Sequence, residues 1–523
     1  MAGKSKVILF GIDGGTAAVL DPLMRTGRLP NLAALAARGC RATLESTIPW
    51  HSAAAWTTAV TGVQPGRHGI FNFFEMKRDL RNLPLGSGDA RAEKLWGAMN
   101  RHGLSAGVVN VPMTYPAEPV RGFMISGLPN PAASIHPPER RQTAAGIGSF
   151  LDETAELRDG YFINPRREPE ARIRMDLDRA AAAESLADLA PDFLMFVCSA
   201  TDELQHRMWH SWDVSHPANP RCDLSWEPQA IPRAYEAADS ILAKLIRVFG
   251  GPETTVIVMS DHGFGPAKKI VFPNRLLAEW GFLSPSVATP GALSADPNYA
   301  PSKIGFDPRR TRAFMGPALV GPFAEIFINA AGRFDGGIVA PGEEFERVRD
   351  EIAARFLDWR DPLSGFKPVV AAHKRESLYD GPHAAAAPDL LIEFADCRTM
   401  AEASEYPAII DAVPWHIPTK AQTGTHIRDG ILIAAGPGIR GSADAGRLSI
   451  ADIAPAVLYA AGLPVPEGLD GRLPERIFTP ERLAAQPVMS EAPRLADSAA
   501  GSQTDPEDTA HMTRILEGLG YFS

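Results

Sequence analysis

The sequence predicts an α/β fold with a mostly parallel central sheet that is covered by helices on both faces. Short apolar runs rich in β-branched residues alternate with segments of helical composition, a pattern typical of strands buried on both faces. Acidic residues follow directly on several of these runs, and the carboxyl ends of parallel strands meet at one edge of a sheet. With 523 residues, 45% of them hydrophobic, the chain can bury a sizeable core.

The first predicted strand is Lys6–Ile12, a short apolar run that ends at a Gly-Gly turn signal. An Ala- and Leu-rich helix is predicted at Asn31–Arg38, and Gly39 stands where helices commonly end. A further helix at Arg91–Arg101 leads into a strand at Ala106–Val111. This alternation of strand and helix is typical of a parallel sheet.

The next part of the chain repeats the pattern. A helix predicted at Arg172–Ala190 precedes the strand Phe193–Ser199. An amphipathic helix at Ala234–Phe249, closed by a Gly-Gly-Pro stop, precedes the strand Thr254–Ser260. The strands predicted for the central sheet are completed by two more apolar runs, Asp389–Phe394 and Gly430–Ala435.

Between Phe264 and Pro388 the strand and helix rhythm is interrupted by a stretch richer in Pro and Gly. We expect residues 264–388 to form an insertion folded over the sheet as a cap, leaving 1–263 and 389–480 as the main α/β domain. Residues 481–523 are expected to hold a flexible linker, because 484–508 is polar, small and Pro-containing, and then a short helix at 509–519.

Composition excludes several classes of protein. The formal net charge of −10 argues against a binder of nucleic acid polymers. No apolar run approaches the roughly 20 residues of a membrane helix, and the N-terminal run is too short for the core of a signal peptide. Cys40, Cys198, Cys222 and Cys397 lack metal-finger or redox spacing. They fit reduced thiols, so we expect a cytoplasmic protein.

Three aspartates occupy equivalent places in the predicted sheet. Asp13 directly follows the first strand, Asp202 lies a few residues beyond the third, and Asp261 directly follows the fourth. Side chains at these strand ends converge on one crevice. Three carboxylates gathered there would repel one another unless cations held them, which predicts a metal site.

Histidines accompany these aspartates. His206 is four residues after Asp202, a spacing that places both on one face of a helix; His262 follows Asp261, and His426 precedes a strand. Taken singly, such residues are more often surface pairs or turns, and only their joint placement at strand ends favours a metal site. Mixed histidine and carboxylate ligands suit zinc, manganese or iron better than calcium.

A candidate nucleophile lies in the segment from Ser46 to Gly62, where a strand-like run enters a helix rich in Ala, Trp and Thr. Ser52 is expected at the N-cap, where its hydroxyl and the free backbone N–H groups could meet a phosphate. A serine beside a metal ion loses its proton readily and can attack, although a simple capping role is the alternative. Downstream, Asn72 could donate its amide to a phosphoryl oxygen, and His68 is expected to be structural.

Five ordered segments resemble the alkaline phosphatase superfamily, and within it the type I phosphodiesterase and nucleotide pyrophosphatase branch. They are ILFGIDGG, the nucleophile segment running into TGVQPGRHGI, TDELQHRMW, SDHGFGP and GTHIRDGILIAAGPGI. The stretches KKIVFPNRLLAEWGFL and APDLLIEF also look like this branch. The resemblance extends from about Lys6 to Leu473, and motifs in this number and order are specific.

The resemblance implies a three-layer α/β sandwich with two divalent ions, usually zinc, with manganese also suited to the ligands. One ion would be held by Asp202, His206 and His426, and the other by Asp13, Asp261 and His262. Ser52, the nucleophile, would bridge the ions or bind beside the second one as a further metal ligand. Counting back from Thr61-Gly62 places the nucleophile at Ser52, with Thr47 as the alternative. Asn72 lies one residue out of register with the phosphate-binding Asn of related pyrophosphatases.

The implied activity is hydrolysis of a small phosphate ester, possibly a nucleotide, through a covalent phosphoserine. A phosphomonoesterase is the nearest alternative, and a non-catalytic metal-binding protein is a third. A sulfatase is disfavoured because Ser52 lacks the required Pro and Arg context, and the longer signatures of phosphoglycerate-type mutases are not found. Specificity is expected in the insertion, where Lys268 and Lys269 could meet a phosphate or simply be solvated.

Overall fold

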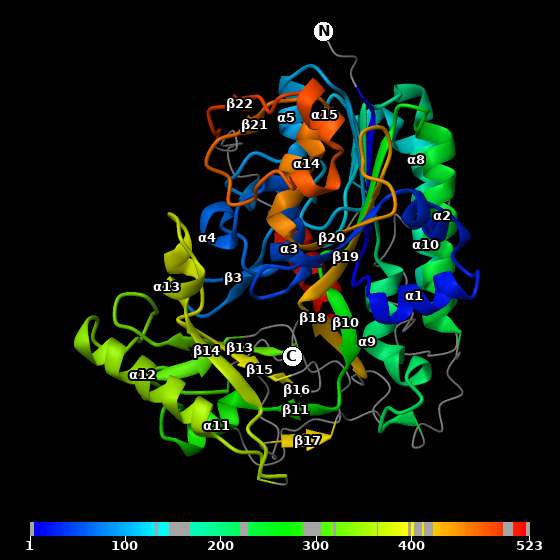
Figure 1. Ribbon diagram of the computed structural model, residues 1–523. Coiled ribbons are helices and arrows are strands. Elements are labelled where there is room, and N and C mark those ends of the chain that lie inside the picture. Colours follow the sequence, from blue (N-terminus) through cyan, green and yellow to red (C-terminus); the bar gives the residue numbers. More distant parts are fainter. Residues whose placement is uncertain are drawn as a thin grey trace.

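The computed structural model describes residues 5–130, 134–145, 168–219, 229–285, 305–316, 321–362, 364–395, 399–401, 410–412, 422–494 and 506–518. Within them, the larger lobe is built around a nine-stranded sheet of order β20-β2-β19-β9-β1-β8-β5-β6-β7 (Figure 1). The strands are β1 (Val7–Ile12), β2 (Cys40–Glu45), β5 (Ala106–Val109), β6 (Gly122–Ile125), β7 (Ile135–His136), β8 (Phe193–Cys198), β9 (Thr255–Met259), β19 (Asp429–Ala435) and β20 (Ala443–Ser449).

Most neighbouring strands of this sheet are parallel. β1 lies between β8 and β9 and is parallel to both, and β5 is parallel to β6 and β8. Only β19, which pairs with β2 and β9, and the edge strand β7 run antiparallel to their neighbours among the described strands. The predicted α/β class with a mostly parallel sheet is therefore confirmed.

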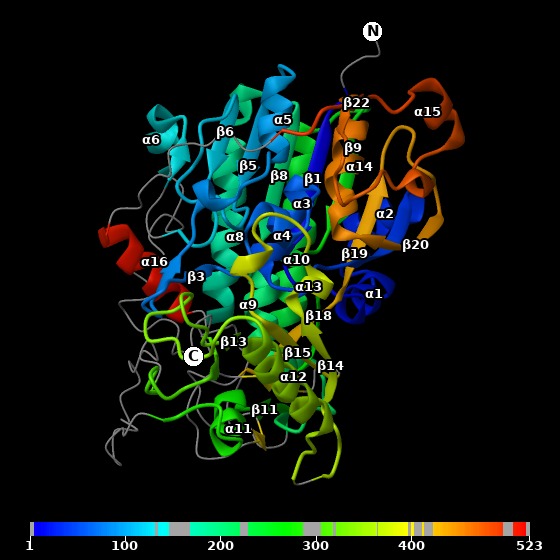
Figure 2. The same cartoon turned by 90° about the vertical axis from the view of Figure 1, so that its left-hand side faces the viewer.

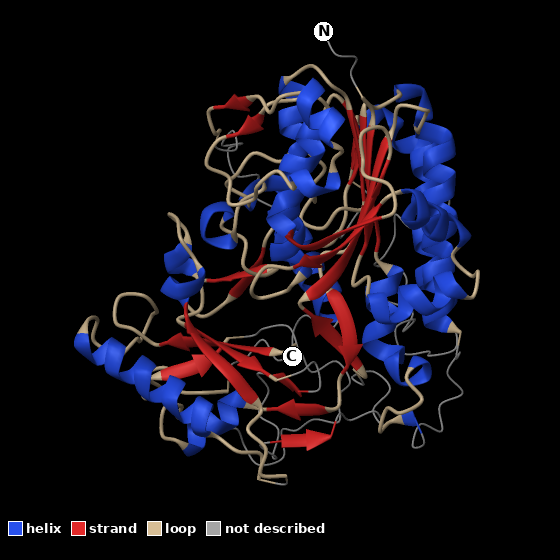
Figure 3. Ribbon diagram, in the orientation of Figure 1, coloured by secondary structure: helices blue, strands red, loops and turns tan. Residues whose placement is uncertain are grey.

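Helices cover both faces of the sheet, which makes three layers (Figure 3). Alternate residues of β1 divide between the two cores: Ile8 and Phe10 pack toward one layer, and Val7 and Leu9 toward the other. The first layer contains α1 (Ala17–Arg25), α2 (Pro30–Arg38), α8 (Glu168–Ser185), α9 (Ala200–Trp212) and α10 (Ala230–Phe249). The second contains α3 (Ser52–Thr61), α5 (Leu95–Arg101) and α14 (Ile453–Ala460).

A smaller lobe lies beside the carboxyl ends of the central strands (Figure 2). Its main sheet has the order β12-β13-β15-β14 and consists of antiparallel pairs. These strands are β12 (Ala313–Met315), β13 (Phe323–Ile328), β14 (Val369–Lys374) and β15 (Leu390–Phe394). α11 (Pro273–Glu279) and α12 (Glu343–Asp358) pack on this sheet, and β11 (Lys269–Val271) pairs with β16 (Thr399–Ala401) and β17 (Ile410–Ala412).

One predicted strand belongs to a different sheet from the one expected. The run Asp389–Phe394 does form a strand, β15, but it pairs with β13 and β14 in the smaller lobe rather than with the central sheet. An apolar strand buried on both faces has the same sequence pattern in either sheet, so the pattern could not distinguish the two. The smaller lobe therefore takes strands from both sides of residue 388, and the boundaries predicted for the insertion stay a prediction.

The C-terminal region is more ordered than its composition indicated. Residues 484–494, expected to be loose, include the end of α15 (Pro480–Ala485) and β22 (Ser490–Glu491), which pairs with β21 (Val465–Pro466). Glu491 also forms an ion pair with Arg101, with Oε1 2.7 Å from Nη2. The predicted terminal helix is α16 (Pro506–Gly518), and the middle of the predicted linker, 495–505, lies outside the described residues.

Two observations concern the predicted cytoplasmic location: the state of the cysteines and the length and polarity of the helices. Cys40 and Cys198 are buried free thiols, and Cys222 and Cys397 lie outside the described residues. Every helix that the structure describes is too short or too polar to cross a bilayer. A cytoplasmic location stays a prediction.

His68, at the end of α4 (Pro65–His68), is fully buried beside α3. Its Nδ1 accepts a hydrogen bond from the Ile70 backbone N–H at 3.1 Å, so the proton is on Nε2, which lies 3.0 Å from Thr58 Oγ1. Burial, together with the charge of His383, lowers the pKa of His68 to about 3. The ring is a neutral structural link, as the sequence predicted.

We expect this histidine to make the fold acid-sensitive. Unfolded chains take up the proton near pH 6.5, but the folded protein does not until about pH 3. The stabilisation is therefore complete above pH 6.5 and is lost as the pH falls from there toward 3. Between pH 6.5 and 4, the Tm of wild type should fall more steeply than that of His68→Gln, corresponding to up to about 1.4 kcal/mol per pH unit. Scanning calorimetry in EDTA excludes metal release as a cause, and parallel Tm curves would contradict the prediction.

Candidate metal and nucleophile site

The predicted acidic and histidine residues come together at the carboxyl ends of the central strands. Asp13 follows β1, Asp261 and His262 follow β9, and Asp202 and His206 lie on α9, which follows β8. His426 is on β18 (Gly424–Ile427), which pairs with β10 (Gly263–Pro266). All six side chains are buried, with exposed fractions of 8% or less. The structure thus brings them together in one buried cluster at the strand ends, as the positions of the strand ends predicted.

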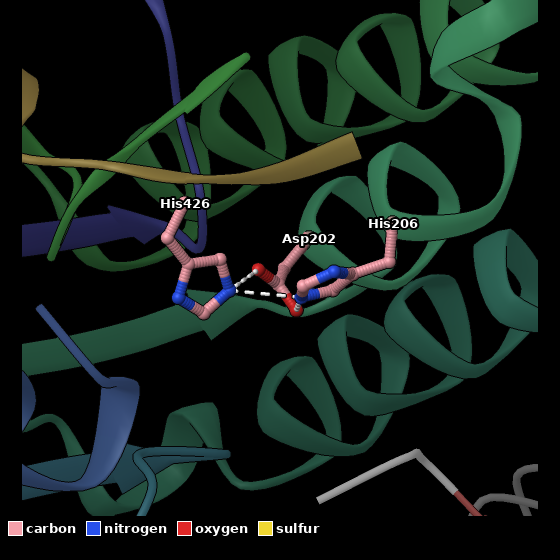
Figure 4. Close-up of side chains that lie close together, drawn as sticks. All are labelled: Asp202, His206 and His426. Carbon is pink, nitrogen blue, oxygen red and sulfur yellow. Dashed lines mark hydrogen bonds and ion pairs between the residues drawn. The ribbon is translucent and has the colours of Figure 1, made fainter. Parts of the chain in front are cut away.

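Asp202, His206 and His426 form one candidate metal-binding group (Figure 4). The two histidine Nε2 atoms are 2.8 Å apart, and Asp202 Oδ1 lies 3.1 Å from Nε2 of His426. Oδ2 of Asp202 lies 3.5 Å from Nε2 of His206. The spacing of four residues between Asp202 and His206 places both on the same face of α9, as the helical period requires.

The protonation of these rings indicates that the group fits a cation. Nδ1 of His206 faces the Gly424 carbonyl at 3.3 Å, and Nδ1 of His426 faces the Trp50 carbonyl at 3.0 Å. A carbonyl only accepts hydrogen bonds, so Nδ1 carries the proton in each ring and Nε2 carries a lone pair. Two lone pairs 2.8 Å apart repel unless a proton or a metal ion lies between them. Backbone carbonyls that orient the second ring nitrogen are typical of metal-binding histidines.

Asp13, Asp202 and His262 form a second candidate group that shares Asp202 with the first. Nε2 of His262 lies 3.7 Å from Asp13 Oδ1 and 3.9 Å from Asp202 Oδ1, while its Nδ1 is 3.1 Å from the Gly263 carbonyl. Asp261 borders this group, with Oδ2 3.2 Å from Nε2 of His262. The resemblance implied Asp261 as the third member, so both aspartates remain candidates for the second ion.

Two carboxylate oxygens in the site lack hydrogen-bond donors among the described residues. They are Oδ1 of Asp202 and Oδ2 of Asp261, and both are fully shielded from solvent. Leaving a buried carboxylate oxygen without a partner is costly. Buried oxygens that face imidazole lone pairs are the donor set of a divalent transition metal, so the residues present fit the predicted ions.

Burial and mutual repulsion oppose ionisation of two of the carboxyls. Burial, followed by the charges of Asp261 and Asp202, raises the pKa of Asp13 well above its usual range. Burial and the charge of Asp202 raise the pKa of Asp261 to about 7. Burial also opposes ionisation of Asp202, but the surrounding histidines, His206 first, outweigh it and lower the pKa. Cations would compensate the charge that these groups share.

Ser52 begins α3 and points into the second group. Its Oγ lies 3.2 Å from Nε2 of His262 and 3.4 Å from Oδ1 of Asp13, and the side chain is 1% exposed. The predicted N-cap position is wrong by one residue: His51 is the N-cap, and Ser52 is the first residue of the helix. The free backbone N–H groups of the first turn therefore lie beside the hydroxyl, as a phosphate site requires.

The structure shows no contact between the metal and nucleophile site and three other predicted phosphate-binding residues, Asn72, Lys268 and Lys269, among the described residues. The Asn72 Oδ1 accepts a hydrogen bond from the neighbouring Phe73 N–H at 2.7 Å. Nζ of Lys269 forms an ion pair with Oδ2 of Asp361 at 2.5 Å. No described contact links Asn72 or Lys268 to Ser52. A phosphate-binding role for Asn72 stays a prediction.

Sequence reasoning missed several residues that support the site. The indole N–H of Trp56 donates to Oδ2 of Asp13 at 2.9 Å. Trp56 is four residues after Ser52, so the helical period was an available signal that it shares the face of Ser52. The ring lies close across β1, where a Cβ on Gly11 would come within 2.4 Å of it. Glycine at position 11 therefore makes room for the indole that orients Asp13.

The start of α9 is also held in place. Oδ2 of Asp176, on α8, accepts a hydrogen bond from the Ala200 N–H at 2.9 Å, and Oδ1 accepts one from the Ser199 N–H at 3.3 Å. These are free donors of the first turn of α9, which carries Asp202 and His206. A carboxylate at this end of the helix also interacts favourably with the helix dipole.

Solved structures with similar folds include phosphonoacetate hydrolase from Sinorhizobium meliloti 1021 in complex with phosphonoformate. It has 17% sequence identity and a TM-score of 0.53, and the match covers 88% of this chain and 96% of that one. Murine ectonucleotide pyrophosphatase / phosphodiesterase 5 in complex with AMP has 14% identity and a TM-score of 0.54, covering 91% of this chain and all of the murine chain. Its human counterpart has 13% identity and a TM-score of 0.51. These likenesses confirm the predicted alkaline-phosphatase-like fold.

Comparison with curated proteins finds no match. The family model for type I phosphodiesterase / nucleotide pyrophosphatase matches residues 7–426. This span contains β1, the segment around Ser52, α9, the residues after β9, and His426 at its end. Since the match covers most of the chain, the protein belongs to the type I phosphodiesterase / nucleotide pyrophosphatase family and is a phosphoester hydrolase, as its motifs predicted.

Proposed function

We propose that this hydrolase cleaves phosphodiester or pyrophosphate bonds of a small substrate through a covalent phosphoserine at a two-metal site. The observation that supports it most is the position of Ser52 Oγ, which borders both Asp13 and His262 at the start of a helix. A buried hydroxyl beside a carboxylate and histidine cluster is suited to nucleophilic attack on phosphorus.

In this proposal the site holds two ions, one with Asp202, His206 and His426, and one with Asp13, His262 and either Asp261 or the shared Asp202. The ions would lower the pKa of the Ser52 hydroxyl and offset the charge that develops on the phosphoryl oxygens. The protein supplies the arrangement. Backbone carbonyls fix the three imidazoles, and the indole N–H of Trp56 orients Asp13.

The reaction then has two displacements. Ser52 Oγ, deprotonated, forms a bond to phosphorus while the bond from phosphorus to the leaving oxygen breaks, and the leaving group takes up a proton. Water next attacks the same phosphorus, the bond to Oγ breaks, and the Ser52 hydroxyl regains a proton. The N–H groups at the start of α3 are placed to donate hydrogen bonds to the phosphoryl oxygens in both steps.

The substrate class we propose is a small phosphate ester, including nucleotides. The murine relative is seen in complex with AMP. A net charge of −10 does not oppose such a ligand, because ions in the crevice would make it locally positive. Zinc is the ion we propose, since mixed carboxylate and imidazole ligands suit it, and manganese is the alternative.

Metal analysis combined with two chromogenic substrates tests this function. Purified protein should contain about two divalent ions per chain and hydrolyse bis-p-nitrophenyl phosphate faster than p-nitrophenyl phosphate. Preference for the monoester would favour the phosphomonoesterase alternative. Protein without bound metal and without hydrolysis of either ester would contradict the proposal and favour a non-catalytic role.

Removal of the ions is expected to destabilise the fold. Without cations, the buried carboxylates of Asp13, Asp202 and Asp261 repel one another. An ion present at about a thousand times its Kd stabilises the folded state by about 4 kcal/mol. We therefore expect EDTA to lower the Tm by roughly 5 °C in scanning calorimetry.

Excess zinc or manganese should restore the Tm after EDTA treatment. Calcium serves as the control ion and should restore less, because it prefers oxygen ligands. An unchanged Tm in EDTA, with metal loss verified by elemental analysis, would contradict a metal-stabilised site.

A further inference from the structure

We propose that Glu325, on β13 of the smaller lobe, is a positioning residue for Ser52 and acts through His51. The inference rests on the proposed function, because it concerns how the nucleophile of that reaction is held. It starts from the four residues before Ser52, Ile48–His51, which we term the nucleophile turn. Contacts from both lobes meet at this turn.

On one side, the nucleophile turn is joined to the metal site. The carbonyl of Trp50 accepts a hydrogen bond from Nδ1 of His426 at 3.0 Å, and the Trp50 indole N–H donates to the His426 carbonyl at 3.2 Å. The carbonyl of His51 accepts the first hydrogen bond of α3, from the Ala55 N–H at 2.8 Å. A shift of His51 would therefore shift the start of the helix and Ser52 with it.

On the other side, the nucleophile turn is held by the smaller lobe. The Tyr379 hydroxyl donates to the Ile48 carbonyl at 2.8 Å. The rings of Trp50 and Phe323 meet edge to face, with centroids 4.4 Å apart. The third contact is between Nε2 of His51 and Oε1 of Glu325, at 3.3 Å.

The contact between His51 and Glu325 joins two buried side chains whose facing atoms have no other hydrogen bond among the described residues. His51 is 2% and Glu325 5% exposed. Among the described residues, the two ring nitrogens of His51 make no hydrogen bond of good geometry, and Oε1 of Glu325 accepts none. The contact between Nε2 of His51 and Oε1 of Glu325 is thus the polar contact that the structure shows for these two atoms. Burying both is costly, and an apolar pair would serve stability as well or better.

The position of Glu325 along β13 strengthens this argument. Every residue of Phe323–Ile328 is buried, and Glu325 is the single charged residue in the strand. A buried polar pair in such surroundings favours one placement of the two segments, because separating the two groups would leave each buried without a polar partner. The pair of His51 and Glu325 therefore holds the smaller lobe against the nucleophile turn, which sets the position of Ser52.

Displacing a nucleophile by about 1 Å can slow the chemical step by about 100-fold without preventing binding. We therefore expect Glu325→Ala to slow release of the first p-nitrophenolate from bis-p-nitrophenyl phosphate by about 100-fold. This is measured in single turnovers with enzyme in excess. The half-saturating enzyme concentration should stay within about threefold, and the metal content should stay at the wild-type value. Glu325→Gln retains the Oε1 acceptor and should recover most of the rate.

The smaller lobe offers a matched control. His373 and Glu393 form a second histidine–glutamate pair, with Nε2 2.8 Å from Oε2, across the β14 and β15 strands. Glu393→Ala should leave the single-turnover rate within about twofold of wild type. Equal decreases of the single-turnover rate in Glu325→Ala and Glu393→Ala would overturn the proposal. An unchanged rate in Glu325→Ala, or a change in its half-saturating enzyme concentration alone, would overturn it as well.

Orthovanadate distinguishes this proposal from the proposed function. If wild type hydrolyses neither ester, the proposed function fails, and the Tm increase produced by vanadate becomes the measurement. The increase should be present in wild type and Glu393→Ala and be reduced in Glu325→Ala. An equal increase in all three proteins, or no increase in wild type, would overturn the positioning role.

Discussion

Replacing Ser52 by alanine is expected to lower turnover of bis-p-nitrophenyl phosphate by about 10⁴-fold or more while leaving the metal content unchanged. Loss of a nucleophile removes the covalent route entirely, and effects of this size are typical of such substitutions. Ser52 Oγ lies 3.2 Å from His262 and 3.4 Å from Asp13, but the two groups of candidate ligands do not depend on it. Turnover and elemental analysis of the same preparation provide the test.

The control for this variant is Thr47→Ala, because Thr47 is the alternative nucleophile in the sequence. Its hydroxyl donates to the Pro49 carbonyl at 2.8 Å within the segment before α3. We expect Thr47→Ala to retain most of the activity and the covalent intermediate. If Thr47→Ala were inactive and Ser52→Ala active, the nucleophile would be Thr47 and the assignment of Ser52 would be wrong.

Replacing Asp202 by asparagine is expected to abolish activity through loss of metal. Asp202 belongs to both candidate groups, and its Oδ1 lies 3.1 Å from Nε2 of His426 and 3.9 Å from Nε2 of His262. An amide in this place removes a full negative charge that offsets the charge of the ions. We expect fewer than two ions per chain by elemental analysis, and turnover reduced by more than about 10³-fold.

Two further variants make this result interpretable. Asp213→Asn changes an aspartate at the other end of α9 and should keep both ions and the activity. Asp261→Asn tests whether Asp261 or the shared Asp202 completes the second group. Loss of one ion would assign it as a ligand, and unchanged stoichiometry and rate would restrict the second group to Asp13, Asp202 and His262. Wild-type metal affinity in Asp202→Asn would refute both groups.

The site residues that could be predicted from the sequence are those whose positions follow from local patterns, namely strand ends and helical spacing. Asp13 and Asp261 follow apolar strands, and the spacing between Asp202 and His206 fits a helix, so strand ends and helical period were sufficient to gather them. The central sheet was predictable for the same reason, since its strands are continuous apolar runs.

The contacts between distant segments were not predictable in this way. Glu325 meets His51 across 274 positions of the chain, and neither residue has a neighbour in sequence that indicates the other. The strand β15 has the same apolar pattern as a central strand, and its sheet is decided by the pairing with β13. Such pairings depend on how lobes pack, which single-sequence periodicity does not encode.

The strand order of the central sheet has a consequence for how the chain must be made. β2 lies between β19 and β20, so both of its neighbours come from the C-terminal part of the chain. Glu45 is synthesised 384 residues before its partner Asp429. At about 5–20 residues per second, both edges of β2 stay unpaired for tens of seconds on the ribosome. Unpaired strand edges are templates for aggregation, so β2 is a segment at which aggregation can start before β19 has been made.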